Sequence, residues 1–213
     1  MLFDLDGTLV RYRGVDFESS WGALGVAAGV QQAWDELLAR YLGQPDRYED
    51  WVRENAALLA GVAVADVNSQ LFPLPYADGA AKAVAELRRA GALLGVVSSG
   101  VGLVARRAKE ELGLDFAVAN QLEVRDGRFT GAAVLRVGLW DKLGVVKECG
   151  RRFGFSLSEA AFVGDHLNDI PVLRCVGWGV AYRPKAPAVQ AAARLVTEEF
   201  ADIPSLLLGL RSS

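Results

Sequence analysis

Two aspartates separated by a single residue lie close to the start of the chain, in the run Asp4-Leu5-Asp6-Gly7-Thr8. They follow a short apolar segment, and Gly7 allows the backbone to turn sharply directly after them. Paired carboxylates bind hard divalent cations, and a carboxylate can also act as a nucleophile or as a proton donor. Taken alone, however, the run is equally typical of a turn that leads into a helix.

A carboxylate that attacks a phosphate group must overcome repulsion between two anions. The reacting atoms come within about 3 to 3.5 Å of each other, and at that distance the repulsion is worth several kcal/mol even in a moderately polar site. A Mg²⁺ ion held by carboxylates, together with a lysine ammonium, would neutralise it. The sequence contains both kinds of group.

A second pair of carboxylates, Asp165 and Asp169, follows the apolar residues 160–163. Because the carboxyl ends of parallel strands meet at one edge of a sheet, we expect both to lie near Asp4. Asp169 also precedes Ile-Pro, which is typical of a helix start. His166, the only histidine, lies between them; we expect it to be a loop residue, and a role in proton transfer stays open.

Hydroxyl and ammonium groups occur at two further element boundaries. Ser98 and Ser99 end an apolar segment and precede a helical pattern, so that a hydroxyl and backbone amides can face an anion. Lys142 begins a later helical pattern and can complete the charge balance. Lys147 lies nearby and competes for that role, but the interval from Ser98 and the apolar pattern that follows favour Lys142.

The elements that must position these groups follow from the pattern of apolar residues. Short apolar runs that alternate with longer amphipathic segments predict βαβ units and a parallel sheet. Strands are expected at 1–5, 93–97, 116–119, 160–163 and 176–181, and helices at 79–90, 101–112, 142–153 and 186–194.

Local signals refine this pattern. Asp78 and the sequence Ser156-x-x-Glu159 resemble helix caps, and Asp126-Gly127 predicts a tight hairpin turn within residues 121–131. Residues 15–72 instead form a helical pattern rich in Ala, Leu and Trp, which predicts a small subdomain inserted directly after the first strand and lying over the sheet edge. The core would then comprise residues 1–14 and 73–213, and we assign the tryptophans of the insert to packing.

Composition narrows the class of protein. The 213 residues are 52% hydrophobic and carry 26 acidic against 23 basic residues, so no positive field favours binding to nucleic acid. No apolar segment is long enough to cross a membrane and no signal peptide is visible, so the cytoplasm is the expected location. Cys149 and Cys175 lack metal-ligand spacing, and we expect buried, reduced thiols. Nothing in the sequence predicts an oligomeric state.

Taken in order, the motifs Asp-x-Asp-Gly-Thr, a strand-terminal Ser, a Lys and Gly-Asp-x-x-x-Asp resemble the haloacid dehalogenase superfamily, in a spacing similar to its phosphoserine phosphatase branch. The similarity extends from Met1 to about Ile203 and is faint within the helical insert. The resemblance implies a Rossmann-like α/β fold, with a parallel sheet flanked by helices and a helical cap. It also implies a Mg²⁺-dependent hydrolase of a small-molecule phosphomonoester.

The resemblance assigns a role to each motif. Asp4 would be the nucleophile that forms an aspartyl-phosphate, and Asp6 the general acid and base. The Mg²⁺ ligands would be Asp4, the backbone carbonyl of Asp6 and Asp165, with support from Asp169. Three phosphate-binding residues and one substrate-binding loop residue complete the expected site: Ser98, Ser99, Lys142 and Asn168.

Two positions depart from the phosphoserine phosphatase pattern. Relatives of that branch carry a Glu that pairs with the substrate ammonium, and loop spacing aligns Arg13 with that position. They also carry an Arg that binds the substrate carboxylate, and the apolar pattern of the helix aligns Asn55 with it, although Arg53 lies half a turn away. We therefore expect L-phosphoserine to be a poor substrate, with Arg11 or Arg13 favouring a ligand that carries extra negative charge or hydroxyl groups. Phosphoserine phosphatase activity proper, phosphoryl transfer to an acceptor alcohol and, remotely, a non-catalytic binding module are the alternatives. Dehalogenase chemistry is disfavoured, because those relatives lack the second Asp.

Overall fold

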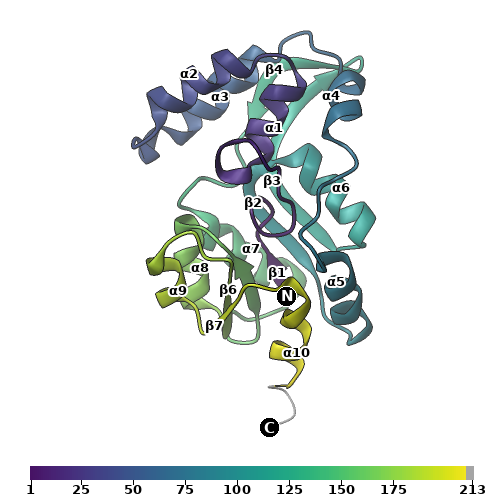
Figure 1. Ribbon diagram of the computed structural model, residues 1–213, viewed down its shortest axis with the longest axis vertical. Coiled ribbons are helices and arrows are strands. Elements are labelled where there is room, and N and C mark those ends of the chain that lie inside the picture. The colour runs from purple at the N-terminus through teal and green to yellow at the C-terminus, as the bar shows by residue number, and fades with distance from the viewer. Residues whose placement is uncertain (210–213) are drawn as a thin grey trace.

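Seven strands form one sheet in residues 1–209, the part of the chain that the structure, a computed structural model, describes (Figure 1). The strand order is β4-β3-β2-β1-β5-β6-β7, and every neighbouring pair is parallel except β3 with β4. The predicted α/β fold is therefore confirmed. The strands are Leu2–Phe3 (β1), Gly95–Val101 (β2), Phe116–Arg125 (β3), Arg128–Val134 (β4), Ala161–Gly164 (β5), Trp178–Tyr182 (β6) and Leu195–Thr197 (β7).

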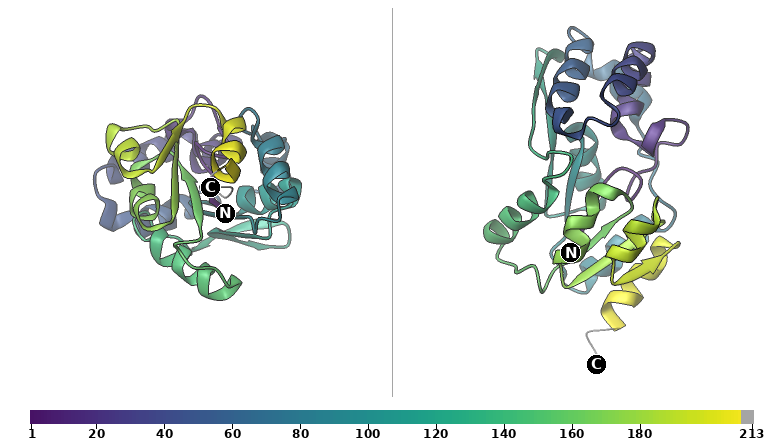
Figure 2. Two further views of the ribbon diagram at one scale, coloured as in Figure 1. Left: turned by 90° about the horizontal axis from the view of Figure 1, so that it is seen from below. Right: turned by 90° about the vertical axis from the view of Figure 1, so that its left-hand side faces the viewer.

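Helices cover both faces of the parallel part of the sheet (Figure 2). Successive side chains of a strand point to opposite faces, so Phe3 packs in the core that includes α5, α6 and α10, while Leu2 packs in the core that includes α7, α8 and α9. These six helices are Ala80–Arg89 (α5), Gly102–Leu112 (α6), Lys142–Phe153 (α7), Ile170–Cys175 (α8), Pro187–Ala192 (α9) and Ile203–Leu208 (α10). Burial on both faces explains why the central strands read as continuous apolar runs.

The chain between β1 and α5 folds into four α-helices, which lie beyond the carboxyl ends of the parallel strands (Figure 1). Trp21, Trp34 and Trp51 are buried between three of them, with ring centroids 5.5 to 6.4 Å apart, so these tryptophans do pack a core as predicted. The helices are Ser20–Ala27 (α1), Gln31–Tyr41 (α2), Tyr48–Leu58 (α3) and Val64–Leu71 (α4). The division into a core and a cap subdomain at residues 14 and 73 stays a prediction.

The β3–β4 hairpin connects the sheet to this helical segment (Figure 1). Helix α3 packs against β4, and the amides of Gly61 and Val64 donate to the carbonyls of Phe129 and Gly127 at 2.8 and 2.9 Å. The predicted tight turn is present: Asp126 and Gly127 both have positive φ, 51° and 72°, as a two-residue hairpin turn requires.

Three local predictions were wrong. Gly79 rather than Asp78 occupies the N-cap of α5. The Ser156 hydroxyl does donate to Glu159, but within a turn that leads into β5, because the residues between them form no helix. Cys149 is buried as expected, whereas Cys175 is exposed at the end of α8; both thiols are free.

Sequence patterns also missed two short elements, β7 and α10, of three and six residues. By contrast, α8 begins at Ile170 with Asp169 as its N-cap, as the Ile-Pro signal predicted. Among residues 1–209, no helix combines the length and the apolar character that crossing a bilayer requires.

Candidate active site

Three buried carboxylates meet at the carboxyl ends of the adjacent strands β1 and β5. Asp4, Asp165 and Asp169 each offer one oxygen atom, and these three atoms lie within 4.8 Å of one another. Their proximity follows from the pairing of the two strands, because Phe3 is in register with Val163 and the amide of Asp4 donates to the Val163 carbonyl at 2.9 Å. The sheet thus brings together motifs that are about 160 positions apart in the sequence.

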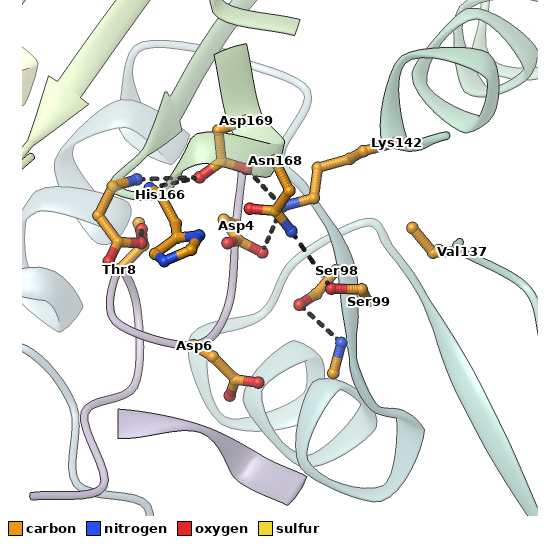
Figure 3. A network of polar contacts seen from close by, with 12 residues as sticks. Asp4, Asp6, Thr8, Ser98, Ser99, Val137, Lys142, His166, Asn168 and Asp169 are labelled. Atoms are coloured by element: carbon orange, nitrogen blue, oxygen red, sulfur yellow. Dashed lines mark hydrogen bonds and ion pairs between the residues drawn. The ribbon is translucent and has the colours of Figure 1, made fainter. Parts of the chain in front are cut away.

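Lys142, at the start of α7, supplies the only buried ammonium group in the described part of the chain (Figure 3). Its Nζ lies 3.0 Å from Oδ1 of Asp4 and also contacts Oδ1 of Asp169. Burial by itself would lower the pKa of this lysine, but the charges of Asp169 and Asp4 outweigh it and raise the pKa. The ammonium therefore stays charged beside Asp4, whereas Lys147 on the same helix is exposed.

The Gly-Thr pair after Asp6 shapes the pocket around Asp165. The Thr8 hydroxyl donates to Oδ1 of Asp165 at 2.8 Å. Gly7 has a φ of +75°, and a Cβ atom at this position would lie 2.3 Å from Oδ2 of Asp165. A side chain at position 7 would therefore displace the carboxylate, which gives the Asp-x-Asp-Gly-Thr signature a steric reason.

Asp169 organises the loop that carries Asp165. Its Oδ2 accepts hydrogen bonds from the amides of Asp165 at 3.0 Å and His166 at 3.1 Å, while Oδ1 faces Lys142 (Figure 3). The imidazole of His166 meets the ring of Phe17 edge to face, with centroids 5.7 Å apart, and burial lowers its pKa. His166 is thus an uncharged loop residue at neutral pH.

The carboxylate of Asp6 lies apart from this group (Figure 3). It accepts hydrogen bonds from the amide of Ser20 at 2.9 Å and from its hydroxyl at 2.8 Å. Burial and the nearby charge of Asp4 raise the pKa of Asp6 to about 7, although the hydrogen bonds from Ser20 oppose that rise. A carboxyl group with this pKa is present in both its acid and its base form near neutral pH.

Polar side chains of β2 and of the segment after β5 face the same space from the side of Lys142 (Figure 3). The Ser98 hydroxyl accepts a hydrogen bond from the amide of Gly100 at 3.1 Å. The side-chain amide of Asn168 donates to the Ser99 hydroxyl at 3.4 Å, and its Oδ1 is buried without a partner among the described residues. Hydroxyl, amide and ammonium donors therefore surround the position where an anion would meet Asp4.

Sequence reasoning missed a set of donors that converge on one carbonyl of this strand end. The Ser99 carbonyl accepts hydrogen bonds from Trp21 at 3.0 Å, from Tyr48 at 2.6 Å and from Asn120 at 2.8 Å. Two of these donors come from α1 and α3 of the helical segment, so the contacts fix that segment against the strand that carries Ser98. Nothing in the sequence marks Trp21 or Tyr48 for this role, because both also suit a packed helix.

Asn120 has a second function in positioning the site. Its Oδ1 accepts hydrogen bonds from the amides of Arg136 at 2.8 Å and Val137 at 2.9 Å, and the residue is fully buried. It thereby fixes the segment that leads from β4 into α7 and Lys142. Sequence reasoning missed Asn120 as well, because the backbone amides that it holds carry no sequence signal.

Arg13 and Asn55 are the two positions that depart from the phosphoserine phosphatase pattern. Among residues 1–209, no hydrogen bond or ion pair links Arg13 or Asn55 to Asp4 or Asp6. Arg13 is exposed and lines a surface cavity of about 450 Å³ between residues 11–13 and 75–78. Asn55 is fully buried in α3, where its side-chain amide donates to the Trp51 carbonyl at 2.7 Å.

A carboxylate directly before α1 is already paired. Glu18 accepts two hydrogen bonds from the Arg11 guanidinium, both at 2.9 Å, and lies 3.4 Å from Nζ of Lys185. The hydrogen bonds from Arg11 lower the pKa of Glu18, which is therefore ionised and neutralised within this cluster. The Arg11 guanidinium is thus occupied by Glu18, whereas that of Arg13 has no ion-pair partner among residues 1–209.

The acidic cluster fits a divalent cation. Asp4, Asp165 and Asp169 present carboxylate oxygens, the donors that Mg²⁺ prefers, and a single lysine offsets three buried acids. Burial, together with the charge of Asp169, raises the pKa of both Asp4 and Asp165, since the negative charge is not fully compensated. A hard cation at this position would restore the balance.

Comparison with known proteins agrees with this geometry. A family model described as haloacid dehalogenase-like hydrolase matches residues 1–174. The chain is 31% identical to phosphoserine phosphatases of Archaeoglobus fulgidus and Streptomyces coelicolor, over 93% and 99% of its length, but it spans only 56% and 50% of those proteins. It is 28% identical to the phosphoserine phosphatase of Methanocaldococcus jannaschii and spans 92% of that relative.

Solved structures show the same fold. A substrate-bound phosphoserine phosphatase complex superimposes with a TM-score of 0.78 at 27% identity, covering 98% of this chain and 96% of the other. A phospho-aspartyl intermediate analogue of phosphoserine phosphatase gives a TM-score of 0.77, with the same identity and coverage. Together with the arrangement of the motifs around Asp4, these matches show that the chain belongs to the haloacid dehalogenase-like hydrolases.

Proposed function

We propose that this protein is a Mg²⁺-dependent phosphatase that hydrolyses a small-molecule phosphomonoester through an aspartyl-phosphate on Asp4. The observation that carries the proposal is the position of Asp4, beside the charged ammonium of Lys142 and among buried carboxylates suited to a cation. The solved phospho-aspartyl analogue of a related phosphatase supports the same chemistry. Asp4 and Asp6 are both present, which disfavours a role limited to binding.

In the first step, an oxygen of Asp4 attacks phosphorus while the bond from phosphorus to the ester oxygen breaks. Protonated Asp6 gives its proton to that departing oxygen, so the alcohol leaves neutral. In the second step, ionised Asp6 takes a proton from a water molecule as the water attacks phosphorus, which frees Asp4 and releases phosphate. The pKa of Asp6, raised to about 7, suits one residue to both steps.

The remaining residues of the site would balance its charge and position the phosphate group. Asp4, Asp165 and the backbone carbonyl of Asp6 are the groups that would hold Mg²⁺, with Asp169 in support, and the bound ion would lower the repulsion between the carboxylate and the phosphate. Lys142 neutralises Asp4 before attack and the phosphoryl oxygens afterwards. We assign the phosphate-binding role to three polar side chains and one backbone amide: the hydroxyl of Ser98, the hydroxyl and amide of Ser99, and the side chain of Asn168.

The helical segment of residues 15–72 would act as a cap on the core formed by residues 1–14 and 73–213. Trp21 and Tyr48 donate to the Ser99 carbonyl, on the strand whose serines we assign to phosphate binding. A cap in this position excludes water and bulky substrates from Asp4. A cytoplasmic location suits the two free thiols and a metabolite substrate.

Within this class, we propose a substrate other than L-phosphoserine, although the relatives named above are phosphoserine phosphatases. Arg13 and Asn55 replace the two groups that would recognise an amino acid, and the nearby carboxylate of Glu18 is neutralised by Arg11 and Lys185. An ammonium group gains little in such a setting. Arg13, which is exposed and unpaired in the described chain, favours an additional anionic or hydroxyl group on the ligand.

The experiment that tests the proposed function is a screen of phosphorylated metabolites with Mg²⁺ present, read as released phosphate. Hydrolysis of at least one small phosphomonoester, absent from the Asp4→Asn protein, is expected. Repeating the reaction with alcohol acceptors separates hydrolysis from transfer, since a phosphotransferase would form a new ester in preference to free phosphate. No Mg²⁺-dependent turnover of any ester in a broad panel would contradict the proposal.

A further inference from the structure

The hydroxyl of one residue in the helical segment contacts both the proposed acid and the strand that carries the proposed phosphate-binding serines. Ser20 is the first residue of α1 and is fully buried. Its Oγ donates to Oδ2 of Asp6 at 2.8 Å and accepts a hydrogen bond from the amide of Val101 at 2.9 Å, while its own amide donates to Oδ1 of Asp6 at 2.9 Å. One side chain therefore links the loop after β1, the end of β2 and the cap.

This contact fixes the orientation of a carboxyl group. Separate donors hold the two oxygens of Asp6, so rotation about its terminal bond would break at least one hydrogen bond. The pair is also tightly enclosed: a Cβ atom on Gly100 would lie 2.5 Å from Oδ2 of Asp6 and 2.7 Å from Oγ of Ser20. Proton transfer to a leaving oxygen depends on such an orientation, because the acid must lie within hydrogen-bond reach of its acceptor.

A purely structural role for the hydroxyl, as a helix cap, does not account for the contact. The neighbouring Ser19 is the N-cap of α1, and its hydroxyl accepts a hydrogen bond from the amide of Gly22 at 3.0 Å. The start of the helix is thus already satisfied. The Ser20 hydroxyl points instead to Asp6 and Val101.

We propose that Ser20 is a positioning residue, which aims Asp6 at the leaving oxygen and makes that alignment depend on the docking of α1 against β2. The inference rests on the proposed function, in which Asp6 is the general acid. A cap that moves away from the sheet would withdraw both donors from Asp6 together. Acid catalysis would then be confined to the docked state, in which water is excluded.

The test compares Ser20→Ala with Ser19→Ala as the matched control, and with Asp6→Asn as the reference for loss of the acid. Each protein is assayed with Mg²⁺ on an alkyl phosphate, whose leaving group needs a proton, and on p-nitrophenyl phosphate, whose leaving group does not. The measured quantity is kcat/KM, which reports the phosphoryl-transfer step. The ratio of the two values isolates proton donation from general damage to the site.

Ser20→Ala should lower kcat/KM for the alkyl ester by at least about tenfold and for the aryl ester by less than about threefold, a smaller version of the Asp6→Asn pattern. Ser19→Ala should leave the ratio unchanged while lowering the melting temperature. Equal losses on both esters, no loss on either, or the same ratio change in Ser19→Ala would overturn the proposal.

A crystal structure of Ser20→Ala supplies a readout that does not depend on the choice of substrate. The side chain of Asp6 should lose its single orientation, through a second conformer or through weakened density for the carboxylate. A carboxylate held as in the wild type would overturn the proposal. If the wild-type protein hydrolysed neither ester, that result would count against the proposed function, and the structure would still decide the role of Ser20.

Discussion

Nζ of Lys142 lies 3.0 Å from Oδ1 of Asp4, and both side chains are buried. The same ammonium contacts Asp169, so one cation balances two carboxylates in a space with little access to water. Replacing Lys142 with Met should lower kcat by about 100- to 1000-fold, because the developing charge loses a fixed partner. It should also lower the free energy of unfolding of the metal-free protein by about 3 to 5 kcal/mol, since two buried acids are left uncompensated.

Lys147→Met is the matched control, because Lys147 lies on the same helix and is exposed. It should change neither kcat nor the denaturant midpoint appreciably. Equal effects of the two substitutions would show that the contact between Lys142 and Asp4 has no special role.

The raised pKa of Asp6 predicts how activity depends on pH. Phosphoryl transfer needs the protonated acid, and with a pKa of about 7 that form is abundant below neutral pH and lost above it. For an alkyl phosphate at saturating Mg²⁺, kcat/KM should therefore fall as the pH rises through about 7 to 8. An aryl phosphate should show a weaker decline. A kcat/KM for the alkyl ester that stays constant over this range would contradict the acid role.

Removal of the metal ion should abolish phosphatase activity. EDTA is expected to abolish turnover and Mg²⁺ to restore it, whereas Ca²⁺ should bind without supporting turnover, because its larger radius and looser coordination misplace the reacting groups. Full activity after exhaustive chelation would contradict a metal-dependent mechanism.

The same carboxylates predict how the stability of the metal-free protein depends on pH. The pKa values of Asp4, Asp6 and Asp165 lie above their unfolded values near 3.8, so the folded state binds more protons than the unfolded state between about pH 4 and 7. Stability contributed by these groups is therefore greatest at low pH and falls as the pH rises. The melting temperature in EDTA should decrease from about pH 5 to 7.5, and the gain on adding Mg²⁺ should increase over the same interval. A Mg²⁺ effect that shrinks with rising pH would contradict this cluster as the metal site.

Substrate preference tests the assignments of Arg13 and Asn55. Loss of a favourable ammonium partner and of a bidentate guanidinium should each weaken binding of phosphoserine by about 1 to 3 kcal/mol. In a comparison of kcat/KM, L-phosphoserine should be a poorer substrate than amine-free esters such as phosphoglycolate or sugar phosphates. A value for phosphoserine at least about tenfold above all the others, or about 1.4 kcal/mol, would show that these alignments are wrong.

The sequence predicted those parts of the structure that depend on where a residue lies relative to its own strand or turn. Asp4 and Asp165 each follow an apolar strand, and parallel strands bring their carboxyl ends to one edge, so their meeting followed from the fold class alone. The hairpin at Asp126-Gly127 was predictable for the same reason, since the turn type is encoded in two residues.

Contacts that depend on how distant segments dock were not predictable. Ser20 contacts Asp6 only because α1 lies against β2. The spacing of residues in the sequence does not predict such a contact between a helix start and a distant loop. Asn120 fixes the approach to Lys142 through backbone amides, which carry no sequence signal. At Ser156 and Glu159 only half of the predicted capping box formed: the Glu159 carboxylate accepts hydrogen bonds from the amide and hydroxyl of Ser156, but within a turn and not at a helix start.

The measurement that tests the account most directly is to locate the phosphoryl group on the enzyme. Asp6→Asn should accumulate phosphoenzyme with p-nitrophenyl phosphate, because this leaving group needs no acid whereas hydrolysis of the intermediate lacks its base. Acid quenching followed by peptide mass spectrometry should place a hydroxylamine-sensitive phosphate on Asp4. The additional substitution Asp4→Asn should remove it, and Asp4→Asn alone should lower turnover by more than about 1000-fold with the fold intact by circular dichroism. Phosphate on any other residue, or appreciable Mg²⁺-dependent hydrolysis by the pure Asp4→Asn protein, would contradict the account.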